Sequence, residues 1–355
     1  MRIAIIASPF ISVPPHKYGG TELFIAQLAE GLTRLGLDVV VYANGESTVD
    51  AELRWLYPEG EWPITGELYS NLKDLNHTAW ALRDCWKDAD VVHLNNAPGL
   101  AFTRFGGPAV VYTIHHPNLS TLNDFYRQYP NVEYVTISRA QLPPDLLPRM
   151  RTIHHGVDLD CYNFNPNKRE YFAFLGRIAP VKGTHIAIEI AKKAGIPLKI
   201  AGEIQPMFRE YWEKQILPHV DGRFIEYVGE ADLAIKNELL GNAMALLFPI
   251  QWHEPFGLVM VEAMACGTPV LAFSGGAVGE VVCDHVSGYI CRNVNDVVAR
   301  AKDLKKLKPA NIRSYVQQRF SVEQMVRQYC TLYSSVVGAV EKQITGEPEG
   351  PRAVA

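Results

Sequence analysis

Long uncharged apolar runs are missing from this 355-residue sequence. No stretch of about 18 or more residues lacks charged and polar breaks, so we expect no transmembrane helix. The opening segment MRIAIIASPFISVPP has only a short apolar run, and it carries prolines where a signal peptide would have small residues for cleavage. We therefore interpret this segment as a buried first strand.

Closely spaced cysteines are missing as well. The six cysteines are scattered along the chain, and no two of them form a C-x-x-C pair. In a chain of this size, the pattern predicts reduced thiols and a cytoplasmic location, and indicates neither a disulfide framework nor a zinc site. The cysteines are Cys85, Cys161, Cys266, Cys283, Cys291 and Cys330.

The sequence has no excess of basic charge. It contains 34 Lys and Arg residues against 38 Asp and Glu residues, which gives a formal net charge of −4. Acidic residues outnumber basic ones within residues 1–155, and the two are balanced in the remainder. A nucleic acid or an anionic membrane would require a basic patch, so we expect no nucleic-acid partner and disfavour a membrane surface.

Short β-branched runs alternate with helical patterns from one end of the chain to the other. The first series of strand-like runs is RIAIIAS, LDVVVYA, ADVVHL, PAVVYTI and EYVTIS. A second series consists of EYFAFLGRI, LKIAGE, FIEYVGE, ALLFPI, PVLAF and GYIC. Because apolar strands of this kind are covered on both faces, they predict parallel sheets. The predicted fold class is α/β, with two doubly wound Rossmann-like domains facing each other across a cleft.

A polar, turn-rich stretch at 154–170 separates the two series. We therefore expect an N-terminal domain over residues 1–158 and a C-terminal domain over residues 159–332. A long amphipathic helix is predicted near the end of the chain, and its last part, about 333–342, is a candidate to pack back on the first domain. The composition of residues 343–355 predicts a disordered tail.

The segment HEPFGLVMVEAMACG, residues 253–267, places two carboxylates eight positions apart. Glu254 precedes a proline and cannot be helical, so a helix is expected to begin near residue 257. The first turn of that helix would offer unpaired N–H groups to a phosphate. Glu262 lies one turn further along, where it could accept hydrogen bonds from sugar hydroxyls or simply face solvent or pair with a lysine. The expected amide donors are those of Gly257, Leu258 and Val259.

Two loops that follow predicted strands carry further candidate residues. In FLGRIAPVKG, Arg177 and Lys182 lie on one strand-to-helix loop, and two cations there suit a dianionic leaving group. The alternative is an ordinary solvated loop. In ISVPPHKYGGTELF, Gly19 and Gly20 precede a helix and would expose amide donors, although paired glycines are also common in tight turns.

His115 ends the strand-like run in VVYTIHHPN, at the edge where open α/β sheets bind ligands. A purely structural role for this histidine is the alternative. The sequence lacks the H-x-H or H-x-x-H spacing of a metal site, so we predict no metal.

Together these segments resemble the retaining, nucleotide-sugar-dependent glycosyltransferases of family 4, which have the GT-B fold. Glu254 and Glu262 match the E-x7-E signature of that family, GRIAPVKG matches its G-R-x-x-x-x-K-G loop, and YGGTE matches its N-terminal glycine loop. The resemblance covers the chain from Met1 to about Val340. The segment ISVPPHKYGG is also similar to antibiotic-pathway members of the family.

The resemblance implies a role for each group that would surround the donor. Glu254 and His115 would contact the donor sugar, Glu262 would hold the ribose, and Arg177 with Lys182 would neutralise the departing diphosphate. The amides of the helix at 257–259 would bind diphosphate or sugar. Gly20, in the Gly19-Gly20 loop, would approach the diphosphate from the opposite domain, and the backbone near Gly202 and Val228 would frame the base. One departure is His155, where many members carry Asn.

The function implied by the resemblance is transfer of a hexose to an acceptor hydroxyl with retained anomeric configuration. UDP-glucose is the expected donor because it is frequent in the family, and no cofactor or metal is expected. A GT-B sugar-nucleotide epimerase and a non-catalytic nucleotide-sugar-binding protein remain alternatives. A phosphorylase would need a pyridoxal lysine, for which the sequence offers no candidate. An NAD dehydrogenase is disfavoured because no G-x-G-x-x-G follows the first strand. The sequence leaves the acceptor and the oligomeric state open.

Overall fold

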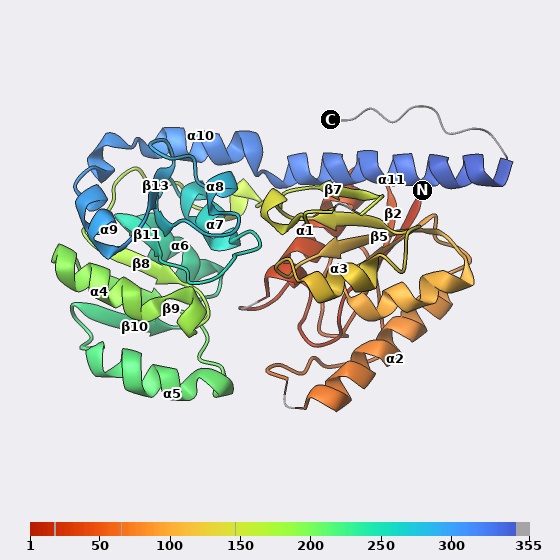
Figure 1. Ribbon diagram of the computed structural model, residues 1–355, viewed down its shortest axis with the longest axis horizontal. Helices are drawn as coiled ribbons and strands as arrows, with labels where there is room; N and C mark the ends of the chain where they lie inside the picture. The colour runs from red at the N-terminus through yellow and green to blue at the C-terminus, as the bar shows by residue number, and fades with distance from the viewer. Residues whose placement is uncertain (18, 65, 146, 346–355) are drawn as a thin grey trace.

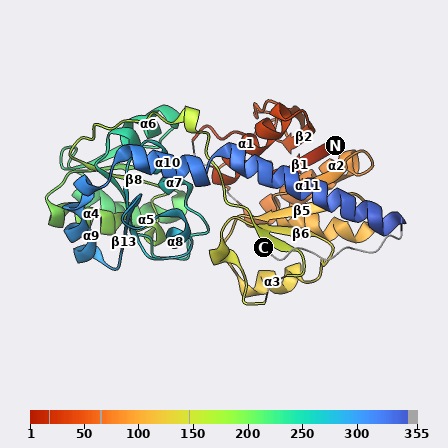
Figure 2. The same ribbon diagram turned by 90° about the horizontal axis from the view of Figure 1, so that it is seen from above.

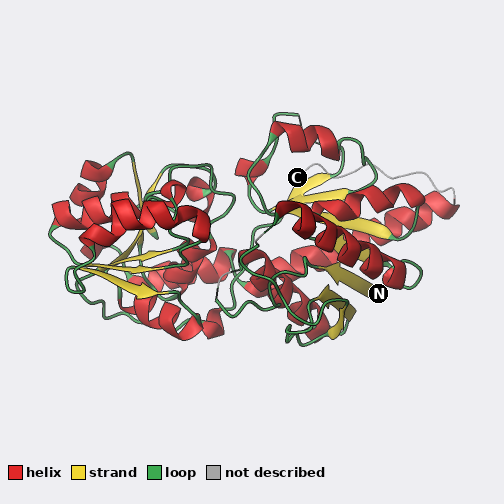
Figure 3. Cartoon of the chain, turned by 90° about the horizontal axis from the view of Figure 1, so that it is seen from below, coloured by secondary structure: helices red, strands yellow, loops and turns green. Residues whose placement is uncertain are grey.

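The computed structural model describes residues 1–17, 19–64, 66–145 and 147–345. These residues form two α/β domains that lie side by side (Figure 1). Each domain consists of a sheet with helices on both faces (Figure 3). The first three residues of the predicted tail, 343–345, belong to the last helix instead, and residues 346–355 lie outside the described residues. Within the described part of the chain, no helix has the length and hydropathy needed to traverse a membrane.

The N-terminal domain contains a seven-stranded parallel sheet in the order β3-β2-β1-β4-β5-β6-β7. All five strand-like runs predicted in this half form strands. The strands that the sequence analysis did not identify are the two at the edges, β3 and β7. The strand bounds are β1 (Arg2–Ile6), β2 (Asp38–Ala43), β3 (Glu52–Trp55), β4 (Val91–Leu94), β5 (Ala109–Ile114), β6 (Glu133–Thr136) and β7 (Met150–Thr152).

Helices cover both faces of this sheet, which explains why its central strands β1, β2, β4 and β5 are mostly apolar. One face packs against α1 (Gly20–Arg34) and α11 (Val322–Thr345). The other face packs against α2 (Glu67–Cys85), the 3-10 helix η1 (Ala97–Phe105) and α3 (Ser120–Tyr126).

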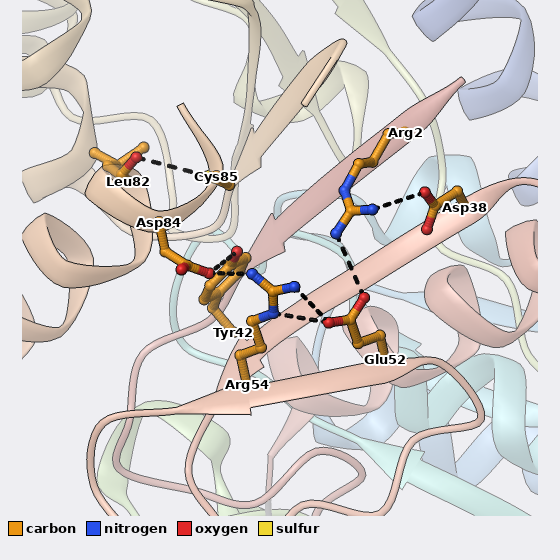
Figure 4. A network of polar contacts seen from close by, with 8 residues as sticks. All are labelled: Arg2, Asp38, Tyr42, Glu52, Arg54, Leu82, Asp84 and Cys85. Carbon is orange, nitrogen blue, oxygen red and sulfur yellow. Dashed lines mark hydrogen bonds and ion pairs between the residues drawn. The ribbon is translucent and has the colours of Figure 1, made fainter. Parts of the chain in front are cut away.

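Edge strand β3 is attached by charged side chains (Figure 4). The Arg54 guanidinium bonds Glu52 on its own strand and Asp84 on α2, and Asp84 also accepts a hydrogen bond of 2.7 Å from the Tyr42 hydroxyl. Arg2 on β1 bonds Glu52 through Nη2 at 3.4 Å. These pairs are largely exposed, so each adds little stability, and they act mainly to keep a short edge strand in register.

The C-terminal domain contains a six-stranded parallel sheet in the order β10-β9-β8-β11-β12-β13. All six strand-like runs predicted in the second series form strands, which confirms the doubly wound class. The strands are β8 (Phe172–Leu175), β9 (Leu198–Ala201), β10 (Ile225–Gly229), β11 (Ala245–Phe248), β12 (Val270–Phe273) and β13 (Gly288–Cys291). The helices are α4 (Thr184–Ala194), α5 (Arg209–Tyr211), α6 (Leu233–Asn242), α7 (Leu258–Ala265), α8 (Val278–Val281), α9 (Val294–Ala301) and α10 (Pro309–Arg319).

The chain returns to the N-terminal domain through α11, which lies along that domain in both views (Figures 1 and 2). Its buried residues belong to the core of the N-terminal domain from Val322 onward, within the range 159–332 that the sequence analysis assigns to the second domain. Polar bonds add to this packing: the Tyr333 hydroxyl lies 2.7 Å from His93 Nδ1, and the Tyr329 hydroxyl lies 2.9 Å from Thr113 Oγ1.

The two chain segments that connect the domains run next to each other. The amide of Val157 donates to the carbonyl of Phe320 at 2.9 Å, and the amide of Val322 donates to the carbonyl of Val157 at 3.1 Å. A Cβ on Gly156 would lie 2.6 Å from the Ser321 carbonyl oxygen, so only glycine permits this approach. Two chain segments, around Val157 and around Ser321, therefore connect the domains side by side, and we call this connection the double crossing.

The packing of α11 on α1 gives a test of this arrangement. A Cβ on Gly31 would lie 2.3 Å from Cγ2 of Val326, a buried β-branched residue with little freedom to move. We expect Gly31→Ala to lower the free energy of unfolding by about 1–3 kcal/mol through overpacking. Urea denaturation followed by tryptophan fluorescence measures the change. Gly338→Ala on α11 is the matched control, since a Cβ there meets nothing within 4 Å. An equal loss of stability in both variants would contradict the packing.

Candidate active site

A cleft of about 560 Å³ lies between the two domains. It brings together all but one of the residues that the sequence analysis selected, from both halves of the chain. Val228 is the exception: it lies on β10, and Glu230 and Ala231 of the following loop line the cleft instead. The selected residues that line it are Gly19, Gly20, His115, Arg177, Lys182, Gly202, Glu254, Gly257, Leu258, Val259 and Glu262.

The N-termini of two helices, one from each domain, meet in this cleft. Helix α1 begins at Gly20 and helix α7 at Leu258, and a Cβ on Gly20 would lie 3.5 Å from Leu258 Cδ1. Gly257 precedes α7 with a φ of 83°, a left-handed conformation that favours glycine. The first amides of each helix lack intrahelical acceptors, so both termini offer N–H groups and positive dipole ends to an anion.

Glu254 is held by two donors, Trp252 from its own loop and Lys182 from the loop after β8. Its Oε2 accepts a hydrogen bond of 2.6 Å from Lys182 Nζ and one of 2.7 Å from Trp252 Nε1. Lys182 Nζ also lies 4.7 Å from the centroid of the Trp252 ring. The carboxylate is buried, with 7% of Glu254 exposed, so the ammonium and the indole replace the water it has lost. The sequence analysis did not identify Trp252, although it lies only two positions before Glu254.

Arg177 follows strand β8 and has an incomplete set of partners. Its Nη1 donates to Gln205 Oε1 at 3.3 Å, and its guanidinium carbon lies 5.8 Å from the centroid of the Phe208 ring. Its Nε is buried and has no hydrogen-bond partner among the residues that the structure describes. A buried unpaired donor is costly. An anion in the cleft would satisfy it.

Glycines let the ends of strands β8 and β9 approach each other closely. Gly202 has a φ of 155°, and a Cβ at this position would lie 1.8 Å from the carbonyl oxygen of Gly176. Tyr227 donates from its hydroxyl to the carbonyl oxygen of Gly202 at 2.7 Å. At Gly202 the wall of the cleft is therefore backbone, with no room for a side chain.

Glu262 is buried on α7 and held through one of its oxygens. Oε1 accepts hydrogen bonds from the Tyr162 hydroxyl at 2.9 Å and from Lys236 Nζ at 2.8 Å. The lysine pairing that the sequence analysis left open is thus present, and Glu262 also lines the cleft. Burial and the neighbouring carboxylate raise the pKa of Tyr162 well above its ordinary value, so this tyrosine remains a donor. Tyr162 follows the 3-10 helix η3 (Leu159–Cys161) and Lys236 lies on α6, and no pattern in the sequence points to either.

Two histidines stack at the N-terminal wall of the cleft. The rings of His115 and His155 lie 5.6 Å apart with an interplanar angle of 17°, and His115 Nε2 lies 2.9 Å from Asn95 Oδ1. Burial lowers the pKa of His115 to about 3, so the ring is neutral near pH 7. His116 points elsewhere, with Nε2 2.6 Å from the Tyr126 hydroxyl. Among the described residues, no cluster of three or more His, Cys, Asp or Glu side chains could hold a metal ion.

Two family models match consecutive parts of the chain. The model described as Glycosyltransferase Family 4 matches residues 18–161, and the model described as Glycosyl transferases group 1 matches residues 162–318. The boundary between the matches falls within the linker between the two sheets.

Individual proteins resemble the chain over most of its length. The D-inositol 3-phosphate glycosyltransferase of Mycolicibacterium smegmatis is 33% identical over 351 residues, covering 81% of this chain and 79% of the relative. The crystal structure of AviGT4, a glycosyltransferase involved in avilamycin A biosynthesis, superposes with a TM-score of 0.71 at 25% identity, covering 95% and 98% of the two chains. Anabaena Alr3699/HepE, solved in complex with UDP and glucose, gives a TM-score of 0.75 at 18% identity over 94% and 100%.

The buried histidine pair predicts acid sensitivity. Burial, with the neighbouring His115 and His154, lowers the pKa of His155 well below its ordinary value of 6.5. The unfolded chain then takes up a proton at His155 below pH 6.5 while the folded chain does not, so stability falls as the pH drops through 6.5. At pH 5 this one group costs at most about 2 kcal/mol, the limit set by the distance of that pH from the ordinary pKa.

We expect His155→Asn to reduce the difference in unfolding free energy between pH 7.5 and pH 5, by no more than that amount. Urea denaturation at the two pH values measures the difference, which is insensitive to any loss of stability common to both. The control is His219→Asn at an exposed position, which should leave the difference unchanged. A His155→Asn protein as acid-sensitive as the wild type would show that the buried ring is already protonated.

Proposed function

We propose that this chain, which belongs to the family 4 glycosyltransferases and has the GT-B fold, transfers a hexose from a nucleoside diphosphate sugar to an acceptor hydroxyl with retained anomeric configuration. The observation that carries the proposal is the convergence of Arg177, Lys182 and the first turn of α7 on one cleft beside Glu254. Breaking the anomeric carbon–oxygen bond leaves the electron pair on the diphosphate, and these groups stabilise the charge that develops there.

Lys182 and Glu254 bind different parts of the donor: Lys182 binds the diphosphate, and Glu254 binds the sugar. In the free protein the ammonium is paired with the carboxylate at 2.6 Å. When donor binds, the diphosphate becomes a second acceptor for Lys182, and Glu254 accepts hydrogen bonds from sugar hydroxyls. The acceptor oxygen bonds the anomeric carbon on the face that the diphosphate leaves, and its proton passes to a departing phosphate oxygen. His115 is neutral and therefore acts as a hydrogen-bonding contact to the sugar.

Glu262 would take the ribose of the nucleotide, with its carboxylate held by Lys236 and Tyr162. The donor we propose is UDP-glucose, because the sequence resembles a family in which it is frequent and because HepE binds UDP and glucose. The backbone near Gly202 and the loop after Val228 would frame the base. All six cysteines are free, which supports the reducing, cytoplasmic location that we propose.

A sugar-nucleotide epimerase is the alternative that uses the same residues. An epimerase converts the donor sugar when no acceptor is present, whereas a transferase needs an acceptor for product to form. Incubation of the protein with nucleotide sugars alone, followed by mass spectrometry and NMR of the sugar, separates the two. A non-catalytic sensor would need no cations for a leaving group, so Arg177 and Lys182 favour the transferase.

The roles of Lys182 and Glu254 give the first functional prediction. We expect Lys182→Ala and Glu254→Ala to lower the rate of hexose transfer by about a hundredfold or more, because each variant loses a group that stabilises the transition state. Transfer to a panel of sugar and alcohol acceptors, measured by mass spectrometry, gives the rates. Circular dichroism confirms folding, and Glu254→Gln preserves the size of the side chain if the alanine variant unfolds.

Lys193→Ala is the matched control for these variants. Lys193 is an exposed lysine of the same domain, paired with Glu189 on the surface of α4. Its removal should leave the rate within about twofold of the wild type, since exposed pairs contribute little. Near-wild-type transfer by the Lys182 and Glu254 variants would refute the proposed site.

The second functional prediction concerns divalent metal and the donor. Because Arg177, Lys182 and the α7 amides supply the positive charge, transfer should continue unchanged in excess EDTA. In a thermal-shift screen of UDP-, GDP-, ADP- and dTDP-sugars, UDP-glucose should raise the melting temperature most, since ligand binding to the native state stabilises it. Loss of transfer in EDTA would contradict metal independence, and a larger shift with another nucleotide would change the assignment of the donor.

A further inference from the structure

A carboxylate from the C-terminal domain makes its hydrogen bonds in the N-terminal domain. Glu280 lies on α8, and its Oε2 accepts from the amide of Arg139 at 2.8 Å while its Oε1 accepts from the amide of Ala140 at 2.7 Å. His154, in the linker between the domains, places Nε2 3.0 Å from Oε2 of the same carboxylate. Each oxygen of Glu280 thus holds a backbone amide of the opposite domain.

These amides begin the 3-10 helix η2 (Arg139–Gln141). The first N–H groups of a helix have no partner within it and are usually satisfied by a side chain just before the helix. Here the charged acceptor comes from a residue more than a hundred positions away. Hydrogen bonds between a carboxylate and helix-terminal amides are strong and directional, so they fix the position of η2 relative to α8.

Within the N-terminal domain, η2 is tied to the end of strand β5. Gln141 Nε2 donates to the carbonyl of Ile114 at 2.9 Å and to the carbonyl of His116 at 2.7 Å. These two carbonyls flank His115, which lines the cleft. A shift of η2 would therefore move the backbone that carries His115.

Within the C-terminal domain, α8 is tied to the loop that carries Glu254. The amide of Ala277 donates to the carbonyl of Glu254 at 2.9 Å, and the amide of Glu280 donates to the carbonyl of Ala277 at the same distance. Gly276 has a φ of 53°, and a Cβ there would lie 2.2 Å from the Glu254 carbonyl oxygen. The turn before α8 and the backbone of Glu254 are in direct contact, with no space for either to move independently.

We propose that Glu280 is a positioning residue that sets the His115-bearing end of β5 against the Glu254 loop across the cleft. Glu280 is not among the residues that line the cleft, so it acts through the two segments that it joins. This inference rests on the proposed function, in which both His115 and Glu254 contact the transferred sugar. Most of the groups that would bind UDP, on α7 and on the loop after β8, lie within the C-terminal domain, so UDP binding should depend much less on the bridge than transfer does.

The test is Glu280→Gln, which replaces one accepting oxygen by an NH2 group that cannot accept from a backbone amide. We expect kcat for hexose transfer to fall about tenfold while the Kd for UDP, measured by calorimetry, stays within about twofold of the wild type. Glu213→Gln, at an exposed carboxylate of the same domain, is the matched control and should leave both values unchanged. A parallel loss of UDP affinity and kcat would indicate general damage and overturn the proposal.

Amide hydrogen exchange provides a measurement that does not require transfer. The amides of Arg139 and Ala140 should exchange about tenfold faster in Glu280→Gln than in the wild type or in Glu213→Gln. If exchange is unchanged, the bridge does not exist in solution; if exchange accelerates but kcat is unchanged, the bridge does not position the site. If the wild-type protein transfers sugar from none of the donors, the proposed function is refuted. The exchange data would still show whether the Glu280 bridge exists.

Discussion

The pairing of the Lys182 ammonium with the Glu254 carboxylate at 2.6 Å is the interaction on which the site depends. Both charges are mostly withdrawn from water, and an isolated buried charge is expensive, so each lowers the cost of placing the other in the cleft. The two residues come from loops after different strands of the second sheet, β8 and β11. Adjacent parallel strands carry both loops to the same edge, which is how the fold supplies the pair.

Much of the fold and part of the site could be predicted from the sequence, because the signals were local. The eleven strand-like runs formed strands because continuous β-branched segments leave few alternatives to a buried parallel sheet. The start of α7 near Gly257 could be predicted because Pro255 excludes a helix at Glu254 and an apolar run follows it. Edge strand β3 was missed because its four residues include two charged ones and none of the four is fully buried, so it has no continuous apolar run.

What the sequence could not provide is contact between distant residues. Lys236 and Tyr162 hold Glu262 from positions 26 and 100 residues away, and no spacing rule links them to it. The burial of α11 from Val322 onward depends on Gly31, whose missing side chain admits Val326. Patterns within one segment identify groups able to bind an anion, but only the tertiary structure determines what satisfies those groups before the ligand arrives.

The connection between the domains determines how the two halves of the cleft move relative to each other. Because α11 is built into the N-terminal core and Val157 is bonded to Phe320 and Val322, any rotation of one domain relative to the other would have to pivot at this double crossing. Glu280 contacts His154 beside that pivot. The ion pair of Lys17 with Glu230, at 3.6 Å, also joins the domains, but it is exposed and so worth little. Contacts near such a pivot change length least during a rotation, so the Glu280 bridge, which includes His154 three residues before Val157, suits a positioning role better than an exposed pair does.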